Sequence, residues 1–169
     1  GRSFAHGAAR LDRPGLVWLS QWFAALGITG YLLHLSLNTW WVMLAMVTYA
    51  TVLTVPTYAL SHEASHGTPF RTRWLNETML WISSVVYFEE PYHRRYAHTS
   101  HHTYTLHVDK DGQIASDLPL NFWGWIKENS GVPFYLYEVK LFLRNATGQF
   151  SPLVSQYTPP GELTKLKLG

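Results

Sequence analysis

Residues 16–37 read LVWLSQWFAALGITGYLLHLSL, and residues 40–60 read WWVMLAMVTYATVLTVPTYAL. Neither run contains Asp, Glu, Lys or Arg. At about 1.5 Å of rise per residue, each run is long enough as a helix to cross the roughly 30 Å hydrocarbon core of a bilayer. Asn38 and Thr39 separate the runs and favour a turn. The sequence therefore predicts a transmembrane helical hairpin over residues 16–60, with a buried helix pair of a soluble protein as the alternative.

The composition supports a membrane protein and restricts the ligands of any bound metal to nitrogen and oxygen. Of 169 residues, 47% are hydrophobic and 14% are charged, against roughly 25% charged in ordinary soluble domains. The absence of Cys excludes disulfides, thiolate zinc sites and Cys-ligated iron–sulfur clusters. A net charge of +2 with scattered basic residues excludes an extended nucleic-acid face.

Basic residues flank the predicted hairpin on one side, and its turn has none. They are Arg2, Arg10, Arg13, Arg71, Arg73, Arg94 and Arg95. We expect the last two at the surface, available for lipid head groups or acidic partners. A hairpin returns the chain to the side from which it entered, and cytoplasmic segments are enriched in Lys and Arg. We therefore predict a multi-pass integral membrane protein in which the segment after residue 60 lies on the cytoplasmic side.

Five of the nine histidines form two groups with helical spacing. His62 and His66 are four residues apart, and His98, His101 and His102 follow at i, i+3 and i+4. Residues with these spacings lie on one face of a helix. Because imidazole is the commonest side-chain metal ligand, the pattern predicts metal binding.

The other four histidines are not expected to bind metal. His93 lies five residues before His98, so a helix rotates it away from the second group. We expect His93 at the surface or at the mouth of a substrate site. His6, His34 and His107 have no predicted role.

The paired groups and their surroundings resemble the membrane fatty acid desaturase and hydroxylase superfamily. The similar segments are HEASHGTPFRTRWLNE at residues 62–77 and YHRRYAHTSHHTYTLHVDKDG at residues 92–112. The resemblance covers roughly residues 30–117. It implies an all-α integral membrane protein with a non-haem di-iron centre, which uses O₂ to oxidise an acyl lipid to an alkene or an alcohol.

The resemblance also implies roles for individual residues and partners. It makes iron ligands of the five histidines, namely His62, His66, His98, His101 and His102. Glu63 and Glu77 would support the imidazoles by accepting their N–H groups. The implied partners are the lipid bilayer, the acyl lipid, O₂ and an electron donor such as ferredoxin, rubredoxin or cytochrome b5.

The sequence departs from the family pattern because no third H-x-x-H-H box follows. We therefore expect a fragment that is inactive alone, with the two irons completed by residues outside it. The predicted organisation is a single incomplete domain. It comprises a polar lead-in (1–15), the hairpin (16–60), a histidine-box region (61–117), and an interfacial segment followed by a loop (118–169).

Local signals predict three details of this region. Gly67, Thr68 and Pro69 should end the second long helix. We expect short helices over residues 74–88 and 92–104, the first in the membrane interface or against the hairpin, and a loop-like chain from Thr147. Residues 109–112 resemble part of a calcium loop, but Leu118 occupies the position of the required Glu, so they predict a turn.

Two alternatives remain open from the sequence. His62-Glu63-Ala64-Ser65-His66 is literally H-E-x-x-H, the motif of zinc metalloproteases, some of which act within membranes. A protease leaves the second histidine group unexplained. The other alternative is a non-enzymatic membrane protein that binds haem or metal through its histidines.

Overall fold

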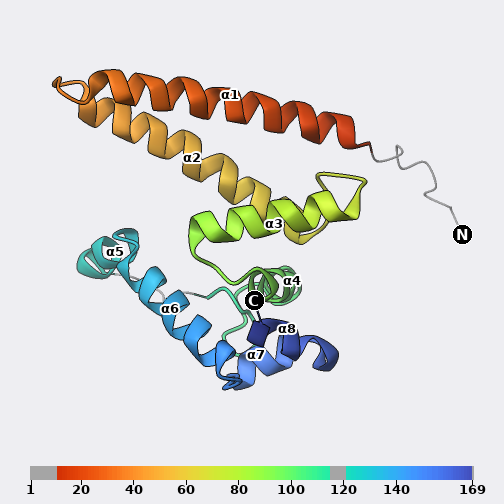
Figure 1. Cartoon of the computed structure of the whole chain (residues 1–169). Helices are drawn as coiled ribbons and strands as arrows, with labels where there is room; N and C mark the ends of the chain where they lie inside the picture. Colours follow the sequence, from red (N-terminus) through yellow and green to blue (C-terminus); the bar gives the residue numbers. More distant parts are fainter. Residues whose placement is uncertain (1–10, 115–120, 169) are drawn as a thin grey trace, which may run out of the picture. The chain divides into compact units, whose positions relative to one another are not determined.

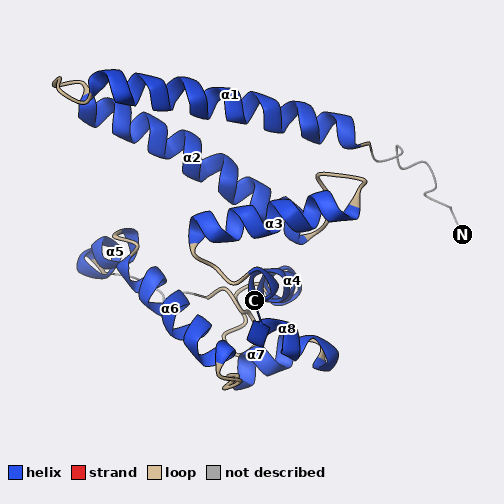
Figure 2. Cartoon of the chain, in the orientation of Figure 1, coloured by secondary structure: helices blue, strands red, loops and turns tan. Residues whose placement is uncertain are grey.

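The computed structural model describes residues 11–114 and 121–168, where all regular structure is helical (Figures 1 and 2). The predicted all-α class is confirmed for these residues. Leu118 and most of the predicted polar lead-in lie outside them. The chain divides into two compact units, Gly1–Leu80 and Trp81–Gly169.

The first unit is built on an antiparallel helical hairpin. Helix α1 spans Asp12–Ser36, and α2 spans Val42–Ser65. The two lie side by side (Figure 1), and the indole Nε1–H of Trp22 donates to the Val52 carbonyl at 2.8 Å. The two predicted apolar runs are therefore helices. Helix α1 begins four residues before the predicted run, because Pro14 is tolerated in a first helical turn.

The hairpin exposes apolar side chains on most of its surface. Both helices are long and apolar enough to cross a membrane, and only 11% and 6% of their most apolar windows are buried. Ile28, Tyr31 and Val47 are each at least 60% exposed. A helix that is apolar on all sides needs apolar surroundings. These two helices are the candidate membrane spans among the described residues.

The segment after α2 folds back onto the start of α1. Gly67 has φ +67, the left-handed conformation that ends many helices, so the predicted helix stop is confirmed. Phe70 is 1% exposed and packs where Gly15 has no Cβ. Asp12 accepts the Thr72 N–H at 2.9 Å, and Asn76 donates to the Phe70 carbonyl at 2.9 Å. These contacts fix the residues that follow His66.

Helix α3 spans Arg73–Tyr87, as predicted from the apolar segment, and the boundary between the units falls within it. The second unit contains α4 at Pro91–Tyr104, α5 at Phe122–Asn129 and α6 at Val132–Ala146. Helix α4 agrees with the predicted short polar helix. Glu90 caps its start by accepting the Tyr92 N–H at 2.9 Å.

The prediction of a loop-like chain from Thr147 is wrong. This region forms α7 at Pro152–Tyr157, a 3₁₀ turn at Pro160–Glu162 and α8 at Leu163–Leu168. Ser151 caps α7 by accepting the Val154 N–H at 3.2 Å. Val154 and Leu166 are buried with Leu141 in a core to which both short helices contribute. Tertiary burial, rather than helix length, stabilises them.

The surface position predicted for Arg94 is also wrong, and so is the surface alternative for His93. Each side chain is 5% exposed on α4. His93 Nδ1 lies 2.8 Å from the Tyr157 hydroxyl, which joins α4 to α7. Arg94 Nε lies 3.6 Å from Glu89, so the guanidinium forms an ion pair within the second unit. The inner face of α4 is therefore polar and joined to other elements by side chains.

Candidate metal centre

The first histidine pair lies at the end of α2. His62 is in the last turn, and His66 is the residue that caps it. Their ring centroids are 5.2 Å apart, and their candidate ligand nitrogens lie within 4.8 Å of each other. The predicted i, i+4 pairing is therefore present in the first unit.

Two glutamates accompany this pair. Glu63 accepts hydrogen bonds from the Thr68 hydroxyl through its side chain and through its backbone carbonyl. Glu77 lies 4.0 Å from the exposed Arg73 guanidinium. The predicted support of imidazoles by Glu63 and Glu77 stays a prediction.

The second histidine group lies on α4, where two imidazoles face each other. His98 Nε2 lies 3.0 Å from His102 Nε2. Two metal–nitrogen bonds of about 2.1 Å that meet at a right angle place their nitrogens about 3.0 Å apart. The distance between the two nitrogens therefore matches that between two ligands of one ion. The His101 ring lies farther away, with its centroid 6.2 Å from that of His98.

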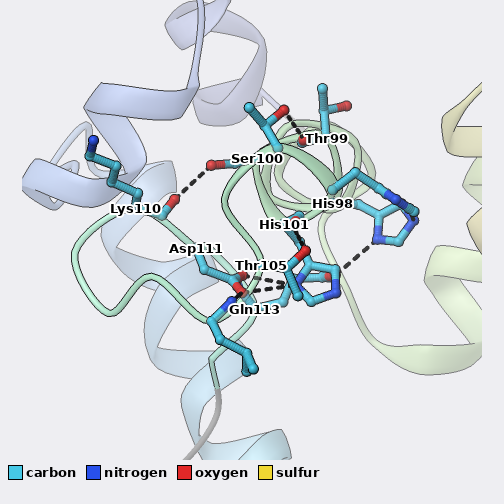
Figure 3. Close-up of polar contacts among 11 residues, drawn as sticks. His98, Thr99, Ser100, His101, Thr105, Lys110, Asp111 and Gln113 are labelled. Carbon is cyan, nitrogen blue, oxygen red and sulfur yellow. Dashed lines mark hydrogen bonds and ion pairs between the residues drawn. The ribbon is translucent and has the colours of Figure 1, made fainter.

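The predicted turn after α4 contacts the second group directly (Figure 3). Both carboxylate oxygens of Asp111 accept from His101 Nδ1, at 2.9 and 3.0 Å. Gln113 Oε1 accepts from His98 Nδ1 at 2.9 Å. A carboxylate and an amide oxygen only accept, so Nδ1 of each imidazole is the donor, and in the neutral form of each ring Nε2 then carries a lone pair. This tautomer suits metal ligation.

Sequence reasoning missed Asp111 and Gln113. The only available signal was their position within fifteen residues of the histidines, in a segment interpreted as a turn. Burial acts to raise the pKa of Asp111, but N–H groups of Gln113 and Leu106 and the His101 ring outweigh it and hold the pKa below its ordinary value. Asp111 is therefore a charged acceptor at neutral pH.

Other buried titratable groups lie elsewhere in the second unit. Burial raises the pKa of Glu138 to about 8, with a further contribution from nearby Glu89, and burial raises the pKa of Glu90 to about 7. Burial lowers the pKa of His93 to about 4, with help from the Arg94 charge. At neutral pH, Glu138 is thus mainly protonated and His93 is neutral.

One comparison with known proteins identifies a relationship. Residues 38–164 match the model of a protein family described as Fatty acid desaturase. The match covers most of the chain and includes both histidine groups, Glu63 and Glu77. No curated protein and no solved structure matches the chain.

Proposed function

The chain belongs to the fatty acid desaturase family, and we propose from this premise that it is part of an O₂-dependent, non-haem di-iron oxidoreductase. Its proposed substrate is an acyl lipid with an unactivated C–H bond. The observation that carries the proposal is the 3.0 Å approach of His98 Nε2 to His102 Nε2 on α4, within a chain of this family.

The proposed ligand set consists of the five histidines with helical spacing. His62 and His66 would come from the end of α2, and His98, His101 and His102 from α4. Neutral imidazole nitrogens suit iron. Because two irons need more ligands than these, residues outside this sequence would complete the centre.

Bound iron would supply the redox chemistry by which O₂ takes up electrons and a C–H bond is oxidised. Desaturation consumes one O₂, two donor electrons and two protons, removes two hydrogens from the acyl chain and releases two waters. Hydroxylation consumes the same reactants, inserts one oxygen into the lipid and releases one water. The chain's own residues would hold the imidazoles in their ligating tautomers and bring them to an apolar substrate.

We further propose that α1 and α2 cross the bilayer and that α3, α5 and α6 lie in its interface. Helices α5 and α6 expose apolar side chains, with Phe122, Trp123 and Leu136 each at least 66% exposed. Lys127 and Lys140 on the same helices suit lipid head groups. The cytoplasmic position of the histidines follows from the distribution of Arg along the sequence.

Iron retention tests the proposed function. The chain would be purified in detergent, incubated with Fe²⁺ under anaerobic conditions, desalted and analysed for bound metal. We expect the wild type to retain iron and the double variant His98→Ala/His102→Ala to lose most of it. His107→Ala is the matched control, because His107 is exposed beyond the end of α4, and it should retain wild-type iron.

The same experiment separates the alternatives. One tightly held zinc and no iron would favour the H-E-x-x-H protease, and a Soret absorption band would favour haem. Equal iron in the double variant and the wild type would contradict the proposed ligand role of α4.

A further inference from the structure

Residues 105–113 form a loop that is attached to α4 at three points. Asp111 accepts from His101, Gln113 accepts from His98, and the Lys110 carbonyl accepts from the Ser100 hydroxyl at 2.6 Å (Figure 3). We propose that Asp111 and Gln113 are positioning residues, which hold His101 and His98 as Nδ1–H tautomers so that each Nε2 can ligate metal. The metal-binding part of this inference rests on the proposed function.

The two acceptors, Asp111 and Gln113, determine which nitrogen of each imidazole carries the hydrogen. A neutral imidazole carries one hydrogen, and only the other nitrogen can ligate. If Nε2 carried the hydrogen, Asp111 would face the lone pair of His101 Nδ1 and repel it. Partners of this kind typically change metal affinity by about 10- to 100-fold.

Asp111 is itself held so that it cannot turn away from His101. Its Oδ1 accepts the Gln113 N–H and its Oδ2 accepts the Leu106 N–H, both at 2.9 Å. The Asp111 side chain is 1% exposed. Each carboxylate oxygen therefore accepts one backbone N–H and also faces the imidazole. This arrangement fixes the direction from which His101 is contacted.

The backbone conformation of residues 105–113 lets the loop lie close to α4. Leu106 has φ +64, a left-handed conformation that is uncommon for a bulky residue, and its N–H is bound by Asp111. A Cβ on Gly112 would lie 3.0 Å from Ala97 Cα on α4, so a larger residue at this position would require the loop or α4 to shift. The neighbours of Gly112, Asp111 and Gln113, are thereby placed within reach of the two imidazoles.

The test reads the tautomers directly. Nitrogen chemical shifts of the imidazoles would be recorded by NMR on the ¹⁵N-histidine-labelled chain in detergent, without added metal, for the wild type, Asp111→Asn, Gln113→Leu and Asp109→Asn. Asp109→Asn is the matched control, because it removes the same charge from an exposed position in the same loop. The unchanged signals of His93, which contacts Tyr157 elsewhere in the unit, would report an intact fold.

We expect His101 and His98 to carry hydrogen on Nδ1 in the wild type. Asp111→Asn should shift His101 toward the Nε2–H tautomer, because the amide NH₂ can donate to Nδ1, which must then carry a lone pair. Gln113→Leu should do the same for His98. Asp109→Asn should leave both tautomers unchanged. Asp111→Asn and Gln113→Leu should each bind Fe²⁺ roughly 10- to 100-fold more weakly than the wild type.

Two results would overturn the proposal. One is a wild-type His101 with hydrogen on Nε2, and the other is Asp111→Asn with His101 signals and Fe²⁺ affinity equal to those of Asp109→Asn. If the wild type binds no Fe²⁺, the proposed function fails, whereas the tautomers still decide whether Asp111 and Gln113 position the imidazoles. If Asp111→Asn does not fold, Gln113→Leu decides, since Gln113 is only half-buried.

Discussion

His98 Nε2 lies 3.0 Å from His102 Nε2, one turn later in α4. Because two nitrogens this close can ligate one ion, the two residues should act as a unit in metal binding. The losses in metal-binding free energy on removing His98 and His102 should therefore not be additive.

A double-mutant cycle on Fe²⁺ affinity measures the coupling free energy between His98 and His102. His98→Ala and His102→Ala should each weaken binding, and the double variant should lose much less than the sum of the two single losses in binding free energy, because either removal disrupts the same ion site. Competition with a calibrated chelator gives the affinities. Additive losses would mean that the two imidazoles bind separate ions.

The pH dependence of stability should report the buried Glu138. Its pKa is raised to about 8 by burial first and by Glu89 second, so the folded state binds a proton that the unfolded state releases above its ordinary pKa of 4.5. Stability should therefore fall as pH rises from about 4.5 to about 8. Melting temperatures from pH 5 to 9 should show a shallower fall for Glu138→Gln than for the wild type. The control, Glu128→Gln, should parallel the wild type, and equal slopes for all three would refute the assignment.

The contact between α1 and the loop after the first histidine pair predicts a steric effect at Gly15. A Cβ there would lie 2.6 Å from Phe70 Cε1 and 2.7 Å from the Pro69 carbonyl. Gly15→Ala should destabilise the first unit by about 1–3 kcal/mol. Gly27→Ala is the control, since nothing lies within 4 Å of its Cβ position, and it should be neutral or slightly stabilising. Thermal unfolding in one detergent compares the variants, and an equally stable Gly15→Ala would contradict the packing.

Oxidation of lipid by this sequence alone should not occur, because five imidazoles cannot complete the two proposed iron sites. Membranes containing the chain, an electron donor and O₂ would be analysed for new alkenes and alcohols by gas chromatography and mass spectrometry. We expect iron binding without product. Product formation by these 169 residues would show that the ligand set is larger than predicted.

Apolar runs, helix stops and histidine spacing were sufficient to predict the hairpin, α4 and the phasing of both histidine groups, because these depend on local periodicity. The same local signals did not predict α7 and α8, which are short and form by burying Val154 and Leu166. They also placed His93 and Arg94 at the surface, because the sequence does not show Tyr157 packing against His93 or Glu89 pairing with Arg94. Asp111 and Gln113 were missed because their partners depend on how a loop folds back.

Metal identity and ligand type in the purified chain test the central claim most directly. Elemental analysis combined with X-ray absorption at the iron edge would identify the metal and its nearest neighbours. We predict iron with only nitrogen and oxygen neighbours, and a loss of most of this iron in His98→Ala/His102→Ala. A chain that holds a single zinc ion and does not bind iron, with the same zinc content in that variant, would contradict the proposed iron centre.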